Sequence, residues 1–344
     1  MVGLTTPEPG YLVPPPDPAD LVIWPEDFGT RFTVFVDTEE EFDWNAPLAR
    51  DCHGTAAMAA MPVAHRRFAE QGVPLTFMID YPIVSDPLAT DILREALADG
   101  VSAVGAQLHA WVNPPFEESL TPPNSYAGNL PPALEAAKLD ALTSAITAAF
   151  GAAPLAYRAG RYGIGPATAA LLSERGYRID SSMRASYSYA RDGGPDFRAV
   201  GNHAFRIGDL VELPLTSIFT GRARRGGVGL HNILGAIPKG RGLFARAGLL
   251  SRIAMTPEDM PLDDVLEAIA VAVGEGLRLL NFSFHSPSLA PGYTPYVRDA
   301  ADLAAFHHWW DRVIADLGRR GVRAASLDQL IAASGALPPG PGIR

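Results

Sequence analysis

Polar side chains that could carry out acid–base chemistry stand directly after several apolar segments of the chain. Histidine is well matched to proton transfer near neutral pH, carboxylates can act as bases, and guanidinium groups pair with carboxylates. One polar residue at the end of a strand often marks only the start of a loop. Several such residues of different types indicate an active site. In this chain the polar residues at the ends of apolar segments are Asp37, Asp80, His109, Arg158, Asp180 and His285.

The first of these positions opens an acidic cluster. Asp37 is followed within six residues by Glu39, Glu40, Glu41 and Asp43. Carboxylates packed at the end of a strand repel one another unless a cation or an arginine compensates them, so the cluster predicts a metal or an arginine partner. A solvated helix N-terminus, where acids are favoured, is an equally good interpretation of the cluster alone.

Two other motifs could supply partners for these acids. Arg158 and Arg161 lie in a glycine-containing turn that continues into Tyr162. His285 ends an apolar segment and precedes a loop rich in proline and glycine that contains Tyr293. A pair of surface arginines and a structural histidine are the plainer alternatives.

Short β-rich segments alternate along the chain with longer helical patterns, which is typical of repeated βα units around a parallel sheet. The expected strands are 31–36, 74–78, 102–108, 155–157, 177–179, 210–213, 277–284 and 322–325. The expected helices are 56–71, 87–99, 133–150, 166–175, 262–275 and 300–320. About eight strands in this order predict an α/β fold, a deformed (β/α)7–8 barrel, whose C-terminal rim gathers the polar residues.

We expect one domain with two appendages and one insertion. A proline-rich arm over 1–30 precedes the barrel at 31–335, and a tail over 336–344 follows it. Residues 213–257 contain seven Lys and Arg residues but no Asp or Glu, and they are rich in glycine. We predict that this basic insertion projects over the active site and attracts an anionic part of a substrate. A mobile, solvated loop is the alternative.

Composition excludes several classes of protein. A formal net charge of −10 argues against a nucleic-acid-binding domain, and the single cysteine, Cys52, excludes an intrachain disulfide framework. The N-terminus lacks the features of a secretory signal, and no segment approaches the apolar length of a membrane span. These observations predict a cytoplasmic protein without a membrane span.

The order of the motifs resembles the polysaccharide deacetylase family, the carbohydrate esterases with a NodB-homology domain. The resemblance covers about residues 32–330, and it rests on Asp37–Glu39, His109, Arg158, the Asp180-Ser181-Ser182 segment and His285. The local sequences around His109 and His285 are most similar to those of the WalW-like branch. The fold implied is the barrel of the glycoside hydrolase and deacetylase type.

The resemblance also implies an activity, the hydrolysis of an N-acetyl group on a carbohydrate or on its cytoplasmic precursor. Asp37 would be the general base, His285 the general acid, and Arg158 would orient Asp37. One divalent cation, zinc or a harder ion, would be bound by Glu39 and His109. The implied substrate-binding residues are Trp111, Arg161, Tyr162, Asp180 and Tyr293.

The chain departs from the family pattern at the second motif, where two histidines separated by three residues are usual. Asn113 follows His109 at that spacing, and Gln107, Glu41 and His53 are the other candidates for a third metal ligand. The alternatives are therefore a catalytically silent carbohydrate-binding relative without a metal, and a glycosidase that uses two of Asp37, Glu39 and Asp180.

Overall fold

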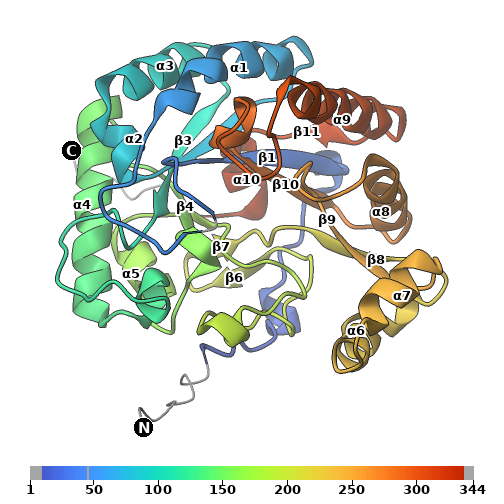
Figure 1. The fold of residues 1–344 in the computed structure, drawn as a ribbon. Coiled ribbons are helices and arrows are strands. Elements are labelled where there is room, and N and C mark those ends of the chain that lie inside the picture. The colour runs from blue at the N-terminus through green and yellow to red at the C-terminus, as the bar shows by residue number, and fades with distance from the viewer. Residues whose placement is uncertain (1–9, 45, 337–344) are drawn as a thin grey trace, which may run out of the picture.

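The computed structural model describes residues 10–44 and 46–336, and its main element is one curled sheet. The strand order is β10-β1-β2-β3-β4-β5-β7-β6, with β11 beside β1, and every pair except β6–β7 is parallel. Figure 1 shows the sheet curled into a half-barrel. The strands are β1 (Arg31–Thr38), β2 (Leu75–Ile79), β3 (Ala103–Leu108), β4 (Ala156–Ala159), β5 (Ile179–Asp180), β6 (Phe205–Ile207), β7 (Leu210–Glu212), β10 (Leu279–His285) and β11 (Arg323–Ala324). The predicted α/β class and the barrel-like sheet are confirmed at this level.

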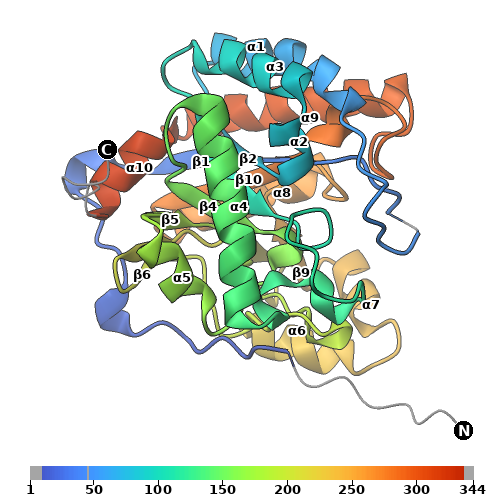
Figure 2. The same cartoon turned by 90° about the vertical axis from the view of Figure 1, so that its left-hand side faces the viewer.

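Helices cover the outer side of the sheet, as the βα alternation predicts. Figure 2 shows the longest helix of the central part, α4, lying across the outer face of the strands. The covering helices are α1 (Met61–Glu70), α2 (Tyr81–Ser85), α3 (Pro87–Leu97), α4 (Pro132–Phe150), α5 (Thr168–Glu174), α8 (Leu262–Gly274) and α9 (Ala300–Arg319). The last helix, α10 (Leu327–Ser334), packs instead on the inner face of the sheet, with Leu327 and Leu330 in one buried cluster with Phe35. No helix within the described ranges is long and apolar enough to cross a bilayer.

The central strands are apolar on both faces because both faces are buried. Val34, Phe35 and Val36 of β1 are fully buried, as parallel strands between a barrel interior and a helix layer must be. On the outer face, Trp310 of α9 packs against Phe284 of β10, with ring centroids 5.6 Å apart. This packing fixes β1 and β10 side by side, and both strands end at the rim that carries the site.

Two short segments, at the two ends of the basic segment 213–257, bridge the half-barrel between β7 and β10. Thr216 N donates to Asn281 O, and the Thr216 hydroxyl accepts from Asn281 N. Ser283 N donates to Met255 O. The two ends of the insertion are therefore anchored to β10.

The insertion folds into a separate projection. An antiparallel ladder of β8 (Ser217–Thr220) and β9 (Ser251–Ala254) supports α6 (Gly227–Gly235) and α7 (Gly240–Arg246). In Figure 1 these helices stand away from the barrel, at the lower right.

The described part of the N-terminal arm is ordered against the barrel. Val13 N donates to Asp196 O, and the stacked rings of Trp24 and Phe28 are buried. Of the predicted tail, only Ala336 lies within the described residues.

Candidate active site

The carboxyl ends of the strands surround a cavity of about 600 Å³. Parallel pairing places Asp37 of β1 directly opposite His285 of β10, and Gln107 of β3 opposite Arg158 of β4. The structure thus brings together five of the predicted residues, which all line the cavity: Asp37, Glu39, His109, Arg158 and His285.

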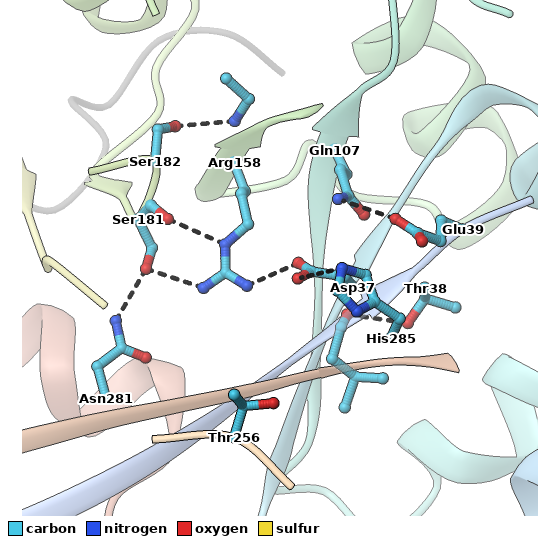
Figure 3. Close-up of polar contacts among 12 residues, drawn as sticks. Asp37, Thr38, Glu39, Gln107, Arg158, Ser181, Ser182, Thr256, Asn281 and His285 are labelled. Atoms are coloured by element: carbon cyan, nitrogen blue, oxygen red, sulfur yellow. Dashed lines mark hydrogen bonds and ion pairs between the residues drawn. The ribbon is translucent and has the colours of Figure 1, made fainter. Parts of the chain in front are cut away.

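Asp37 is held by a buried arginine. Arg158 Nη1 donates to Asp37 Oδ1 over 2.6 Å, and the Arg158 side chain is in turn fixed by Ser181 (Figure 3). Asn281 Nδ2 donates to the Ser181 hydroxyl over 2.9 Å. Asp37 and Arg158 are each about 1% exposed, so this ion pair must be satisfied within the protein.

The ion pair yields a stability prediction. Arg158→Met removes the buried arginine partner of the Asp37 carboxylate, and we expect the free energy of unfolding to fall by about 3–5 kcal/mol. Urea unfolding followed by circular dichroism measures the change. Arg312→Met, at an exposed arginine, is the control and should change stability by less than about 0.5 kcal/mol. A loss below 1 kcal/mol for Arg158→Met would show that the pair is not required for the fold.

His285 is oriented by Glu258. His285 Nδ1 lies 2.7 Å from Glu258 Oε2, and the His285 backbone N–H donates to Glu258 Oε1 over 3.0 Å. The other ring nitrogen, Nε2, lies 3.8 Å from Asp37 Oδ2 and faces the cavity. Burial opposes the charge on His285, but the carboxylates of Glu258, Glu39 and Asp37 outweigh it and raise the pKa of the imidazole to about 10. This shift favours the protonated imidazole that a general acid requires.

Sequence reasoning did not single out Glu258. This residue is the first acid after the acid-free segment 213–257, and it follows β9, a strand that the sequence analysis did not expect. The rule that polar residues follow strands would have found it, had β9 been recognised.

Glu39 and His109 face each other next to Asp37. Glu39 Oε2 lies 3.5 Å from His109 Nε2 and 3.4 Å from Gln107 Nε2. Burial raises the pKa of Glu39 to about 8. Glu39 Oε1 and Gln107 Oε1 are both buried without a hydrogen-bond partner. Unsatisfied buried oxygens beside an imidazole nitrogen are what a cation site offers before the ion binds, so these residues fit a divalent metal.

The opposite side of the His109 ring contacts a second group of acids. His109 Nδ1 lies 2.7 Å from Glu40 Oε2, and Trp111 Nε1 donates to Glu40 Oε1 over 2.8 Å. Glu40, Asp80 and His109 form a buried group that could hold a metal ion. However, Glu40 N already donates to Asp80 Oδ2, and Ile83 N donates to Asp80 Oδ1. These hydrogen bonds make Glu40 a support for His109, fixing the ring with Nε2 toward the cavity.

Three predicted site residues do not line the cavity. The Asn113 side chain donates to Pro114 O and to Lys138 O, at the α4 side of the loop. Asp180 Oδ1 accepts from Ser182 N over 3.0 Å, so it shapes the turn that holds Arg158. Tyr293 is 37% exposed and lies outside the cavity lining.

Of the other three candidates for a third metal ligand, two lie outside the cavity lining and one lines the cavity. Glu41 Oε1 accepts from Ala57 N over 2.5 Å, and His53 is exposed. Neither lines the cavity, whereas Gln107 does. Gln107 is therefore the one of the four proposed third ligands that the cavity contains.

The outer part of the cavity combines aromatic rings with two arginines. Trp111, Arg161 and Tyr162 line it as predicted, and Arg184 joins them. Arg161 and Tyr162 adopt φ angles of 54° and 61°, a conformation that costs about 1–3 kcal/mol per residue and is typical of functional sites.

The guanidinium groups of Arg161 and Arg184 contact rings and hydroxyls. Arg161 lies over the Tyr126 ring at 4.4 Å, and Arg184 lies over the Tyr187 ring at 4.0 Å. Within the described ranges, neither forms an ion pair with a carboxylate. Two cations without counterions in one cavity wall are suited to an anion.

The basic insertion does not cover the site, contrary to the prediction. No residue of 213–257 lines the cavity. The ladder β8–β9 carries its helices outward, and the cavity wall comes instead from residues 42–44, 46–48 and 120–122 and from Tyr126, together with the turn at Arg161.

Comparison with known proteins gives structural matches alone. No family model matches the chain, and no curated protein matches it by sequence. A Mycobacterium smegmatis protein classed provisionally as a polysaccharide deacetylase is similar in structure, with a TM-score of 0.51, 20% identity, and coverage of 96% of this chain and 99% of that one.

Two further matches are weaker. A chitin deacetylase from the fungal pathogen Colletotrichum lindemuthianum has 13% identity and a TM-score of 0.42, with 95% and 96% of the two chains covered. A carbohydrate esterase family 4 pseudoenzyme from Bacillus anthracis has 9% identity and a TM-score of 0.43, with 88% and 66% covered. The Mycobacterium smegmatis match shows that this chain has the fold of that protein.

Proposed function

We propose that this protein is a metal-dependent hydrolase that removes an N-acetyl group from a carbohydrate. The observation that carries the proposal is the pairing of two oriented groups across one cavity: Asp37 fixed by Arg158, and His285 fixed by Glu258. A base and an acid on adjacent strands can act on the two sides of one amide bond. The predicted relation to the WalW-like branch and a cytoplasmic precursor as substrate belong to the same proposal.

Each residue has a distinct task in the proposed reaction. Asp37 accepts a proton from the attacking water, and the protonated Nε2 of His285 donates to the departing amine nitrogen. Glu39 and His109, with Gln107 as a third candidate, would hold a divalent cation. When bound, that cation polarises the carbonyl group and makes water a stronger nucleophile at neutral pH.

The two rival functions explain less of the site. A silent carbohydrate-binding relative would have no use for the buried Asp37–Arg158 pair or for Glu258 behind His285. A glycosidase would have to use Asp37 and Glu39, because Asp180 does not line the cavity, and it would leave both histidines without tasks.

Metal analysis tests the proposed ligand set and separates the two sides of the His109 ring. We expect one divalent ion per chain, lost in His109→Ala and bound at least about 100-fold more weakly in Glu39→Gln. Glu40→Gln removes only a support for the imidazole and should weaken binding about 10- to 100-fold. Competition titration against a chelator, with elemental analysis, measures both.

His203→Ala, at an exposed histidine, is the matched control and should keep the metal. Stronger loss in Glu40→Gln than in Glu39→Gln would move the ion to the Glu40–Asp80–His109 group. Absence of metal from every form after loading would favour the silent binding protein.

The arginines of the outer cavity predict a substrate with an anionic group. Arg184→Gln should raise KM for an N-acetylated sugar that carries a carboxylate by about tenfold, because a charge-assisted hydrogen bond is lost. KM for the neutral analogue should stay within about twofold. Equal changes for both substrates would show that Arg184 supports the cavity wall without recognising charge.

A further inference from the structure

The projection formed by residues 221–250 exposes large aliphatic side chains on its outer side. Ile233 is 63% exposed, Ile237 is 52% exposed and Leu243 is 65% exposed. His231 and Leu234 of α6 are buried instead, with the His231 ring 5.6 Å from the ring of Phe219 in β8. The projection therefore has an inner side packed on its own ladder and an apolar outer side without a partner among the described residues.

The same segment is rich in cations. Segment 213–257 contains no acid, in a chain of net charge −10. Some of its cations are engaged within the protein: Arg224 Nε lies 3.5 Å from Glu275 Oε1, and Arg252 stacks on the Tyr187 ring at 3.3 Å. Five others are exposed and form no ion pair within the part of the chain that the structure describes: Arg222, Arg225, Lys239, Arg241 and Arg246.

Exposed aliphatic side chains and unpaired cations on the same segment match one kind of partner. A polyanion in water would neutralise the charges but would leave the aliphatic side chains exposed. An anionic lipid surface accepts both, because cations bind the headgroups while Ile and Leu enter the boundary between headgroups and acyl chains. Because the segment contains no acidic side chain, none of its residues would be repelled by the anionic headgroups.

The projecting position makes this contact possible. Figure 1 and Figure 2 both show α6 and α7 at the periphery of the molecule, carried there by the β8–β9 ladder. We propose that residues 221–250 dock the protein on the surface of an anionic membrane, without spanning it. This inference is independent of the proposed reaction.

Vesicle sedimentation with the full chain tests the proposal. We expect binding to vesicles of phosphatidylcholine with about one-third phosphatidylglycerol, weak binding to pure phosphatidylcholine, and release at high salt. Arg225→Gln combined with Arg246→Gln should lower the partition coefficient about 25-fold, at about fivefold per cation. Ile233→Ser combined with Leu243→Ser should lower it at least about tenfold.

Matched variants elsewhere on the surface serve as controls. Arg66→Gln with Arg312→Gln removes two exposed arginines, and Leu88→Ser with Val101→Ser removes two exposed aliphatic side chains. Both should bind vesicles as the unmodified protein does, and unchanged circular dichroism shows that each variant is folded. Absence of binding to anionic vesicles, or equal loss in the controls, overturns the proposal. Self-association through the projection without vesicle binding also overturns it, and assigns the surface to a second copy of the chain.

Discussion

Asp37→Asn should reduce deacetylation by about 10²- to 10⁴-fold in kcat/KM, the contribution usual for a general base. Asparagine has the same shape, and its Oδ1 can still accept from Arg158 Nη1, which lies 2.6 Å away in the unmodified protein. The amide cannot accept a proton from water. The rate should fall through kcat with KM nearly unchanged, because the lost interaction belongs to the transition state.

The measurement is acetate release from an N-acetylated amino-sugar oligomer, with metal content determined on the same samples. Asp192→Asn is the control, since Asp192 is a carboxylate that also lines the cavity but is exposed. We expect its rate within about threefold of the unmodified protein. Asp37→Asn with more than a tenth of the original activity and full metal content would remove Asp37 from the role of base.

The sequence was sufficient to predict the strands that carry the site, because their apolar segments are long and end in polar residues. His109 directly follows β3 and His285 ends β10, whereas Asp37 and Arg158 are the penultimate residues of β1 and β4. Both β1 and β4 end two residues beyond the expected positions. Parallel strands bring their carboxyl ends to one rim regardless of the loops between them. The convergence of these side chains therefore depends on topology, which alternation of βα units predicts.

Residues in loops and short strands were less predictable. Asn113 was chosen for its spacing from His109, yet its side chain bonds to Lys138 O of α4, a contact that sequence spacing cannot reveal. Glu258 escaped notice because β9 is short and lies in a glycine-rich segment. The direction in which the insertion projects depends on how β8 and β9 pair, and strand pairing is a long-range property.

Glu258 is expected to set the pH range in which His285 can act as the acid. Glu258 is the largest of the influences that raise the pKa of His285 to about 10, against the effect of burial. In Glu258→Gln the imidazole loses that charge, and its pKa should fall toward or below the ordinary value of 6.5. A general acid works only below its pKa, so the alkaline limb of kcat/KM should move to lower pH.

At pH 7.5 the protonated fraction of His285 in Glu258→Gln would then be about 1–10%, which predicts a rate loss of roughly 10- to 100-fold. The loss should shrink as the pH is lowered toward 6, because more of the imidazole is then protonated. A purely structural role of Glu258 would give a loss independent of pH. Ser288→Ala is the matched control, because it removes the hydroxyl that donates to Glu258 Oε1 over 2.6 Å but keeps the carboxylate. The alkaline limb of kcat/KM in Ser288→Ala should stay within about one pH unit of that of the unmodified protein. An alkaline limb at the same pH in Ser288→Ala and Glu258→Gln would show that the charge of Glu258 does not govern His285.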